Sequence, residues 1–246
     1  MNIPTNMKTD LHTHTIASGH AFGTVWENAR EAKAKGLEMI AITDHGPSVS
    51  GAPVELYFGC GHRMPRIIEG VKVLFGVESS IINNNGDLDL PDSILKKLDF
   101  VIAGLHKDCG YIDQGIEKNT EVLIKTMNNP YVKMISHPYG SAIKVDIEKI
   151  TKIAMEKNIL LEINASYFRQ EKIENKEMWN SLKTMVKILK ANNKKMIINS
   201  DAHSPYEVGR FDDVIAKFAE LGINDDDLLN NDPDAILKFF NVSIYE

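Results

Sequence analysis

The chain of 246 residues is long enough for one large domain or two small ones, and it can bury about 70–75% of its unfolded surface. Hydrophobic residues make up 43% and charged residues 25%, a composition typical of a folded globular protein. The net charge of −6 argues against a dedicated nucleic-acid binder, whose affinity comes from basic groups on phosphates. A bound cation could nevertheless attract a small anionic substrate.

The sequence also indicates a cellular compartment. Two cysteines, Cys60 and Cys109, are too few for a disulfide framework, so we expect a reducing environment in which both are packing or loop residues. No run approaches the roughly 20 apolar residues that cross a bilayer, and the first ten residues lack the apolar segment of a secretory signal. We therefore expect a cytoplasmic protein without a membrane partner.

Short apolar runs alternate with amphipathic stretches along the chain. The runs are about 4–7 residues long and rich in Val, Ile, Leu or Met, which predicts strands covered on both faces by helices. The predicted strands cover residues 7–11, 38–43, 71–77, 100–105, 132–135, 159–163 and 195–198. The predicted helices cover residues 25–35, 146–157, 176–191, 206–221 and 232–240. Gly36 and Gly222 are typical residues to close the first and fourth of these helices.

The alternation predicts parallel strands joined by crossover helices. Seven such units fill the chain without a linker or a low-complexity tract, so we expect a single domain over residues 1–246. The predicted fold is α/β, a seven-stranded (β/α)7 barrel of the TIM-barrel type. An open doubly wound sheet is the alternative, and periodicity alone does not separate the two. The acidic run at 224–227 is interpreted as a turn and helix cap rather than as a metal site.

Polar side chains gather where the predicted strands end. In a parallel barrel all these ends point to one face, where the active sites of such barrels are built. Seven of the eight histidines, one glutamate and one aspartate fall at these ends or in the loop that follows. So many uncoordinated, partly desolvated polar groups would be costly, and metal coordination is the simplest physical solution. The candidate ligands are His12, His14, His20, His45, Glu78, His106, His137, Asp201 and His203.

The spacing within this set supports metal binding. His12 and His14 share one face of the first strand, because residues i and i+2 do so, and could bind one ion. An HxH motif alone is weak, but it is joined here by a glutamate and three histidines at the ends of other strands. Glu78 ends a middle strand, and a carboxylate can bridge two ions through its two oxygens. We therefore expect Glu78 to lie between metals.

Six short motifs give the chain a resemblance to a known family. They are DLHTHT at 10–15, TDHG at 43–46, GVES at 76–79, AGLH at 103–106, SHP at 136–138 and SDAH at 200–203. In this order and spacing the chain resembles the PHP (polymerase and histidinol phosphatase) superfamily, most closely its YcdX-like phosphatase branch. GAP at 51–53, MPRIIEGV at 64–71, NNNGDLD at 83–89 and LEINAS at 161–166 also resemble that branch. The loops at 54–62 and 107–114 depart from the pattern and leave substrate preference open.

The resemblance covers the chain from Asp10 to about Asp213 and implies a distorted seven-stranded barrel with a trinuclear metal site, usually of zinc, at the C-terminal face of the strands. The first metal would be held by His12, His14, Glu78 and Asp201. The second would be held by His106 and His137, with Glu78 as the bridge. The third would be held by His20, His45 and His203. Zinc suits an imidazole-rich site, with Mn²⁺ and Fe²⁺ as alternatives.

Such a site predicts hydrolysis of a phosphate monoester. The charges of three divalent ions and of the ionised Glu78 and Asp201 add up to about +4. A site of this charge would attract a phosphate monoester, which carries a charge of roughly −1.5 to −2. We expect a hydroxide bridging the first two metals to attack phosphorus in line with the leaving alkoxide, while the third metal binds a non-bridging oxygen. Glu78 and Asp201 are thus the predicted catalytic residues, through the metals they hold.

Other residues near the strand ends have two open interpretations. Asp44 could orient a ligand histidine or assist proton transfer as a catalytic residue, or it could cap the next helix. Arg63 and Arg66 could bind the substrate phosphate, or they could be solvent-exposed helix residues. Asn164, on the sixth strand with Glu162, could bind substrate or be structural. His62 ends no strand, although it could touch substrate.

Three other functions compete with a phosphatase. A metal-dependent nuclease or phosphodiesterase has precedent among PHP relatives, but the composition shows no basic excess. An amidohydrolase acting on C–N bonds also uses HxH on a barrel strand, yet a two-metal hydrolase needs no third ligand set. A non-catalytic metal-binding protein is the simplest alternative. We expect a small phosphorylated substrate, no nucleic acid and, from the YcdX-like resemblance, a homotrimer.

Overall fold

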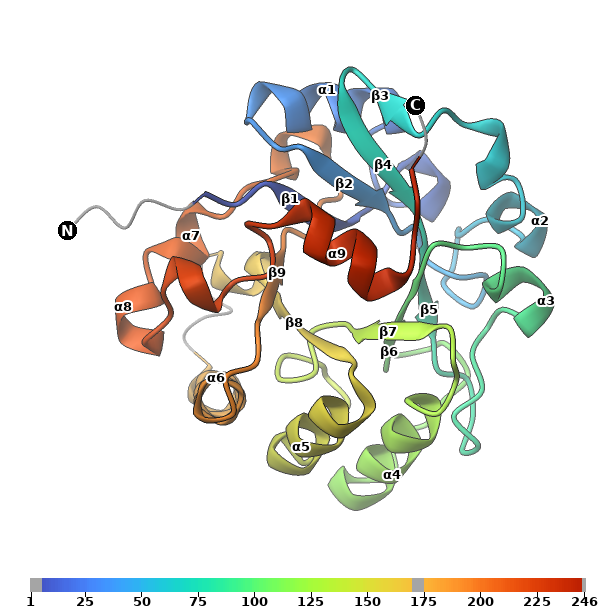
Figure 1. Ribbon diagram of the computed structural model, residues 1–246. Coiled ribbons are helices and arrows are strands. Elements are labelled where there is room, and N and C mark those ends of the chain that lie inside the picture. The colour runs from blue at the N-terminus through green and yellow to red at the C-terminus, as the bar shows by residue number, and fades with distance from the viewer. Residues whose placement is uncertain (1–5, 170–174, 245–246) are drawn as a thin grey trace.

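The strands form two sheets, which a computed structural model describes over residues 6–169 and 175–244 (Figure 1). They are β1 (Thr9–Thr13), β2 (Met39–Ile42), β3 (Ile67–Ile68), β4 (Val71–Phe75), β5 (Val77–Ser80), β6 (Val101–Gly104), β7 (Val132–Ile135), β8 (Leu160–Asn164) and β9 (Ile197–Asn199). One sheet has the order β1-β2-β4-β3 and the other has the order β5-β6-β7-β8-β9. Every pair is parallel except β3 with β4, so the predicted parallel α/β fold is confirmed.

The predicted third strand, residues 71–77, divides into two. Gly76 separates β4, which pairs with β2, from β5, which pairs with β6. A Cβ atom at Gly76 would lie 2.8 Å from the carbonyl oxygen of Phe100, so this close approach of two backbones requires glycine. The backbone hydrogen bonds of the described residues therefore form two sheets instead of the one seven-stranded sheet of the predicted barrel.

In both sheets the strands lie side by side in the order of the chain, except that β3 lies outside β4 at the edge of the first sheet. The two sheets approach each other near the carboxyl ends of β1, β2 and β9. A doubly wound sheet reverses its strand order at a switch point, which neither sheet does. Isolated parallel bridges join Thr13 to Ala202 and His45 to Glu78. Over residues 6–169 and 175–244 no continuous ladder closes the two sheets into a barrel. The bridges nevertheless bring the loop after β9 beside the end of β1 and the loop after β2 beside β5.

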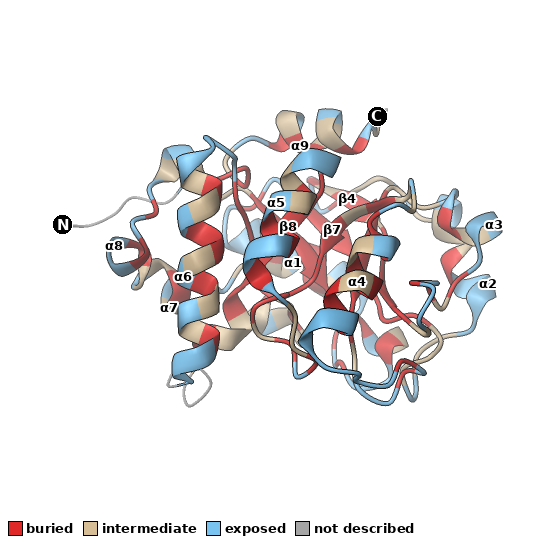
Figure 2. Cartoon of the chain, turned by 90° about the horizontal axis from the view of Figure 1, so that it is seen from below, coloured by how far each residue is buried: buried red, intermediate tan, exposed pale blue. Residues whose placement is uncertain are grey.

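Helices cover the outer faces of the sheets. The longer ones are α1 (Val25–Ala34), α4 (Ile116–Thr126), α5 (Ile147–Lys157), α6 (Lys176–Ala191) and α9 (Pro233–Phe240). Single turns form α2 (Glu55–Phe58), α3 (Asp92–Leu95), α7 (Asp212–Ile215) and α8 (Phe218–Leu221). Figure 2 shows α4, α5 and α6 with buried residues toward the strands and exposed residues on the far side. No helix in the described ranges is long and apolar enough to span a membrane.

Most predicted helices are confirmed. Those at 25–35, 146–157, 176–191 and 232–240 correspond to α1, α5, α6 and α9 within one residue at each end. The single helix predicted over 206–221 is wrong, because Gly209 has a φ of +64° and only the short α7 and α8 follow it. Helix α4 lies where none was predicted. The acidic run at 224–227 is a 3-10 turn, η6 (Asp225–Asp227), in line with its interpretation as a turn.

Helix α9 fills the space between the sheets at the amino ends of the strands (Figure 1). Buried apolar side chains from the strands and their edges, among them Leu11 and Met39, pack with Ile236 and Phe240 of α9. The rings of Phe100 and Phe240 stack with 4.3 Å between their centroids and an angle of 5° between their planes. Aromatic pairs of this kind add about 0.5–1.5 kcal/mol beyond the area they bury. One end of the enclosed space is thus closed by an apolar plug.

Candidate metal centre

Eight of the nine predicted ligands lie near or after the carboxyl end of a strand, whereas Glu78, which was expected to end a strand, is the second residue of β5, just after the end of β4. His12 belongs to β1 and Glu78 to β5, and the others follow strand ends: His14 and His20 after β1, His45 after β2, His106 after β6, His137 after β7, Asp201 and His203 after β9. Eight of the nine form three overlapping groups that could hold metal ions. Within each group one ligand atom from every residue lies within 4.8 Å of the others.

The first group consists of His12, His14, Glu78 and Asp201. Nε2 of His12 lies 3.2 Å from Oε2 of Glu78, and Nε2 of His14 lies 3.1 Å from Oδ1 of Asp201. The two imidazole rings are 5.0 Å apart between centroids, as residues i and i+2 of one strand allow. These four side chains are the ones that the family resemblance placed around one ion, and the structure brings them together.

The second group consists of Glu78, His106 and His137. The Nε2 atoms of both histidines lie 3.1 Å from Oε1 of Glu78. Oε2 of the same carboxylate faces nitrogen atoms of His12 and His45, at 3.2 Å and 2.9 Å. Glu78 therefore presents one oxygen to each side, which is the geometry a bridging carboxylate needs.

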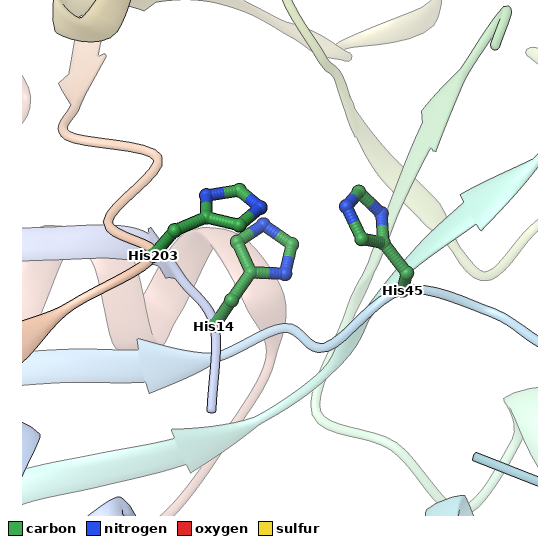
Figure 3. A group of neighbouring side chains, drawn as sticks. All are labelled: His14, His45 and His203. Carbon is green, nitrogen blue, oxygen red and sulfur yellow. The ribbon is translucent and has the colours of Figure 1, made fainter. Parts of the chain in front are cut away.

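The third group consists of His14, His45 and His203, whose side chains lie together in Figure 3. The ring centroid of His14 is 4.3 Å from that of each of the other two. His20, which was expected in this group, lies beside it, with its Nε2 3.0 Å from Nε2 of His203. His14 was expected in the first group alone, and the structure places it between the first and the third.

Two buried imidazole nitrogen atoms without hydrogen-bond partners indicate that these residues fit a metal ion. Among the described residues, Nε2 of His12 and Nδ1 of His45 have no hydrogen-bond partner, although both lie close to Oε2 of Glu78. Buried polar atoms without partners are costly. Nδ1 of His12 is 2.7 Å from Oε1 of Glu162, so the opposite nitrogen can present a lone pair to the Glu78 carboxylate. A cation between the two would stabilise this arrangement, and the residues therefore fit a metal centre.

A layer of hydrogen bonds behind the histidines holds them in place. The fully buried carboxylate of Glu162 on β8 contacts Nδ1 of His12 and accepts a hydrogen bond from the backbone N–H of His137. Nδ1 of His106 lies 2.9 Å from Oγ of Ser80. Such contacts at the second ring nitrogen fix the orientation of an imidazole and leave Nε2 directed at the metal side.

The charges of the site match metal coordination. Burial would raise the pKa of Glu78, but His12 and the neighbouring imidazoles hold it well below its usual range. Burial would lower the pKa of His12, yet the charges of Glu162 and Glu78 raise it well above its usual value. Burial and the nearby His45 lower the pKa of His14 to about 3, so His14 is neutral near pH 7. Ionised carboxylates and a neutral His14 are in the forms that bind cations, whereas a cation would have to displace the proton that the neighbouring carboxylates stabilise on His12.

Two candidate ligands have backbone conformations that non-glycine residues rarely adopt. The φ angle is +30° at His137 and +52° at Asp201. Such conformations cost about 1–3 kcal/mol and persist where the surroundings fix them. Oε2 of Glu162 accepts from the backbone N–H of His137 at 3.1 Å, and Oδ2 of Asp201 accepts from Nδ2 of the buried Asn164 at 3.0 Å. Substrate binding by Asn164 stays a prediction.

Asp44 lies behind the ligands. It is buried, and its carboxylate accepts hydrogen bonds from the backbone and hydroxyl of Thr15, the hydroxyl of Ser18 and the hydroxyl of Tyr57. It does not cap the next helix, α2, whose N-terminal cap is Val54. Helix capping is therefore wrong, and a catalytic role of Asp44, through ligand orientation or proton transfer, stays a prediction.

Arg66 and His62 contact residues outside the histidine cluster, and Arg63 lines a cavity beside α2. Nη2 of Arg66 is 2.7 Å from Oδ2 of Asp99, and the guanidinium lies 5.7 Å from the ring centroid of Phe75. Arg63 is exposed and lines a largely apolar cavity of about 240 Å³ next to α2. His62 is also exposed and contacts a backbone carbonyl through Nδ1. Phosphate binding by these residues stays a prediction.

Sequence reasoning missed Ser18 and left Glu162 without a role. The sequence did carry a signal for Glu162, which is the charged residue of LLEIN, a strand buried along its whole length. A carboxylate in such a strand must have partners, because an unpaired buried charge is too costly. No comparable signal marks Ser18, since serine is common in loops and turns.

Comparison with known proteins identifies similar sequences. The family model described as "PHP domain" matches residues 10–201. A "probable phosphatase" of Thermoanaerobacter sp. (strain X514) is 44% identical over 230 residues, covering 94% of this chain and 93% of that protein. A "probable phosphatase" of Clostridium botulinum (strain Hall) is 40% identical over 231 residues, with 94% and 93% covered.

Two solved structures share the fold. A histidinol phosphate phosphatase of Lactococcus lactis subsp. lactis Il1403, complexed with zinc, L-histidinol and phosphate, matches with a TM-score of 0.58 and 19% identity, covering 87% of this chain and 92% of that one. A chain of an archaeal ribonuclease P with mature tRNA matches with a TM-score of 0.59 and 14% identity, covering 94% and 90%. At these identities the likeness is one of architecture.

Proposed function

The chain belongs to the PHP domain family, and from this membership and its histidine–carboxylate cluster we propose that it is a metal-dependent phosphatase acting on phosphate monoesters. The observation that carries the proposal is Glu78, whose two oxygens face imidazole nitrogens on both sides, two of them without hydrogen bonds. Relatives of similar length are named probable phosphatases, and a structural neighbour was solved with zinc and phosphate.

We propose three divalent ions, with zinc as the metal. The first would be held by His12, His14, Glu78 and Asp201, the second by Glu78, His106 and His137, and the third by His20, His45 and His203. When bound, such ions form hydroxide from water near neutral pH and neutralise charge on the phosphoryl group. Imidazole-rich ligand sets favour zinc, and Mn²⁺ or Fe²⁺ are the other outcomes to be measured.

The protein's own residues would supply binding and orientation. With a net charge of −6 the chain as a whole repels a phosphate, so attraction would come from the metal centre alone. Glu78 and Asp201 have depressed pKa values, each against the effect of burial and through neighbouring histidines, so both stay ionised at neutral pH. His20 is exposed and His203 half-buried, so substrate would enter from their side of the cluster.

The test uses the full-length protein purified without added metal. Elemental analysis gives the number and kind of ions per chain. Initial rates are then compared for p-nitrophenyl phosphate, a phosphodiester, oligonucleotides and amides, each with chelator and with zinc added back. We expect hydrolysis of the monoester that chelator abolishes and zinc restores. Preference for oligonucleotides or amides would replace the phosphatase with a nuclease or an amidohydrolase, and bound metal without any hydrolysis would leave a metal-binding protein.

A further inference from the structure

One serine hydroxyl contacts two of the candidate ligands. Ser18 ends the 3-10 turn η1 (Ile16–Ser18) after β1 and is fully buried. Its Oγ lies 3.0 Å from Nδ1 of His14, 2.6 Å from Oδ1 of Asp44 and 3.1 Å from the backbone nitrogen of His45. A hydroxyl has a single proton to donate, so the direction of these three hydrogen bonds can be worked out.

The direction follows from what each partner can do. The backbone N–H of His45 can only donate, so Oγ of Ser18 accepts from it. The Asp44 carboxylate can only accept, and it also accepts from the hydroxyl of Tyr57 at 2.6 Å, so the Ser18 proton points to Asp44. Ser18 then has only a lone pair left for His14. Nδ1 of His14 must therefore carry the proton of that ring.

We infer that Ser18, oriented by Asp44, is a positioning residue that keeps His14 in the tautomer with its proton on Nδ1 and its lone pair on Nε2. That Nε2 atom faces Oδ1 of Asp201 at 3.1 Å and Oε2 of Glu78 at 3.6 Å. A lone pair directed at two carboxylate oxygens is unfavourable without a cation and favourable with one. The inference rests on the metal centre of the proposed function and explains how His14 is prepared as a ligand before an ion binds.

Without this hydroxyl the opposite tautomer would be preferred. Nε2–H of His14 would then donate to the Asp201 carboxylate, a charge-assisted hydrogen bond roughly twice as strong as a neutral one. A metal would have to displace that proton. Ser18 also fixes the loop that carries His45, whose ring lies 4.3 Å from that of His14. One hydroxyl thus sets the ligand atom of one histidine and the backbone position of another.

The tautomer of His14 can be measured directly by long-range ¹H–¹⁵N correlation of the imidazole nitrogens in the full-length chain. In the wild-type protein we expect Nδ1–H both with zinc bound and after removal of the metal by chelator. In Ser18→Ala the metal-free protein is expected to shift to the Nε2–H tautomer. A metal-free wild-type protein with the proton on Nε2 would overturn the inference, whether or not the variant folds.

Zinc affinity, measured by competition with a chromophoric chelator, is the second readout. Ser18→Ala is expected to weaken it about 10–100-fold, and Ser18→Thr, which retains the hydroxyl, to restore most of the loss. The control is Asp99→Asn, a carboxylate that binds the backbone of Phe75 and the side chain of Arg66, with an expected change of no more than about twofold.

Unchanged zinc affinity and an unchanged tautomer in Ser18→Ala would overturn the inference even if the wild-type protein is an active phosphatase. Neither readout uses a phosphate ester. A protein that binds zinc and shows the expected tautomers but hydrolyses no ester would therefore refute the phosphatase and leave the role of Ser18 standing.

Discussion

At their amino ends the strands enclose an apolar plug, whereas at their carboxyl ends they carry the histidine–carboxylate cluster. Phe240 of α9 is 4% exposed and stacks on Phe100. Glu78 is 1% exposed, yet it is surrounded by imidazole nitrogens. Because both ends are buried to a similar degree, burial does not separate the core from the site. The kind of atom that is buried does, because the plug buries carbon atoms, whereas the cluster buries nitrogen and oxygen atoms, some of them without a hydrogen bond within the described ranges.

Asn199 marks the boundary between the two ends. Its Nδ2 atom lies 3.4 Å from Sδ of Met134 in the apolar cluster and 2.9 Å from Oε1 of Glu162. Its Oδ1 atom accepts a hydrogen bond from the backbone of Leu11 at 2.9 Å. The change from apolar to polar surroundings therefore takes place within one side chain. Substitutions on either side of this boundary should separate stability from metal binding.

The largest expected effect is at the polar end. Glu78→Gln keeps the size of the side chain but replaces one oxygen by an NH₂ group that cannot bind a cation, so the groups sharing Glu78 lose a ligand. We expect fewer zinc ions per chain and a loss of phosphatase activity on the order of 10³-fold, with the fold retained. Elemental analysis, circular dichroism and initial rates measure this. Full zinc content at near-normal rates would contradict a bridging role.

A substitution at the apolar end should have the opposite effect, lowering stability while leaving zinc binding and activity unchanged. Phe240→Ala removes the ring stacked on Phe100, and we expect the free energy of unfolding to fall by about 3–5 kcal/mol, a factor of roughly 10² to 10⁴ in the folding equilibrium. Zinc content and kcat of the folded protein should not change. Urea denaturation gives the loss of stability, and Phe239→Ala, at a half-buried neighbour, is the control with a smaller loss. Zinc loss from fully folded Phe240→Ala would mean that the two ends are coupled.

Glu162→Gln tests the boundary itself. The amide cannot accept hydrogen bonds at both former oxygens, so the contact with Nδ1 of His12 or that with the backbone of His137 is weakened. We expect zinc affinity and activity to fall about 10–100-fold, less than in Glu78→Gln. Chelator competition and initial rates measure this, with the exposed Glu148→Gln on α5 as the matched control. Wild-type zinc affinity in Glu162→Gln would remove Glu162 from the site.

The alternation of strands and helices could be predicted because it is written in local hydrophobic periodicity. Helix α6 agrees with its predicted range, 176–191, at both ends. The division of the third strand could not be predicted, since the apolar run continues through Gly76 and the break depends on the approach of Phe100 from elsewhere in the chain. The helix expected over 206–221 failed for a related reason. Its apolar spacing continues, but Gly209 takes a left-handed conformation that ends regular structure.

The candidate ligands could be predicted because a histidine or carboxylate at the end of a buried strand is rare without a purpose. Which of them share a group could not, because that depends on how loops from different strands approach one another. His14 shows this, since its ring lies between His45 and His203 as well as beside His12. Ser18 shows it further, because only the fold reveals that its hydroxyl faces a histidine.

The substitution of Arg66 has the smallest expected effect. It tests on which side of the molecule the substrate binds. Its Nη2 atom is 2.7 Å from Oδ2 of Asp99, which also accepts from the backbone N–H of Phe75 at 2.6 Å. Arg66→Gln should therefore lower the free energy of unfolding by about 1 kcal/mol and leave zinc content and the KM for a monoester within about twofold. Urea denaturation and steady-state kinetics measure both. A rise in KM of about tenfold at unchanged stability would place the guanidinium on the substrate, and phosphate binding would then move from the side of His20 and His203 to the segment that precedes β3.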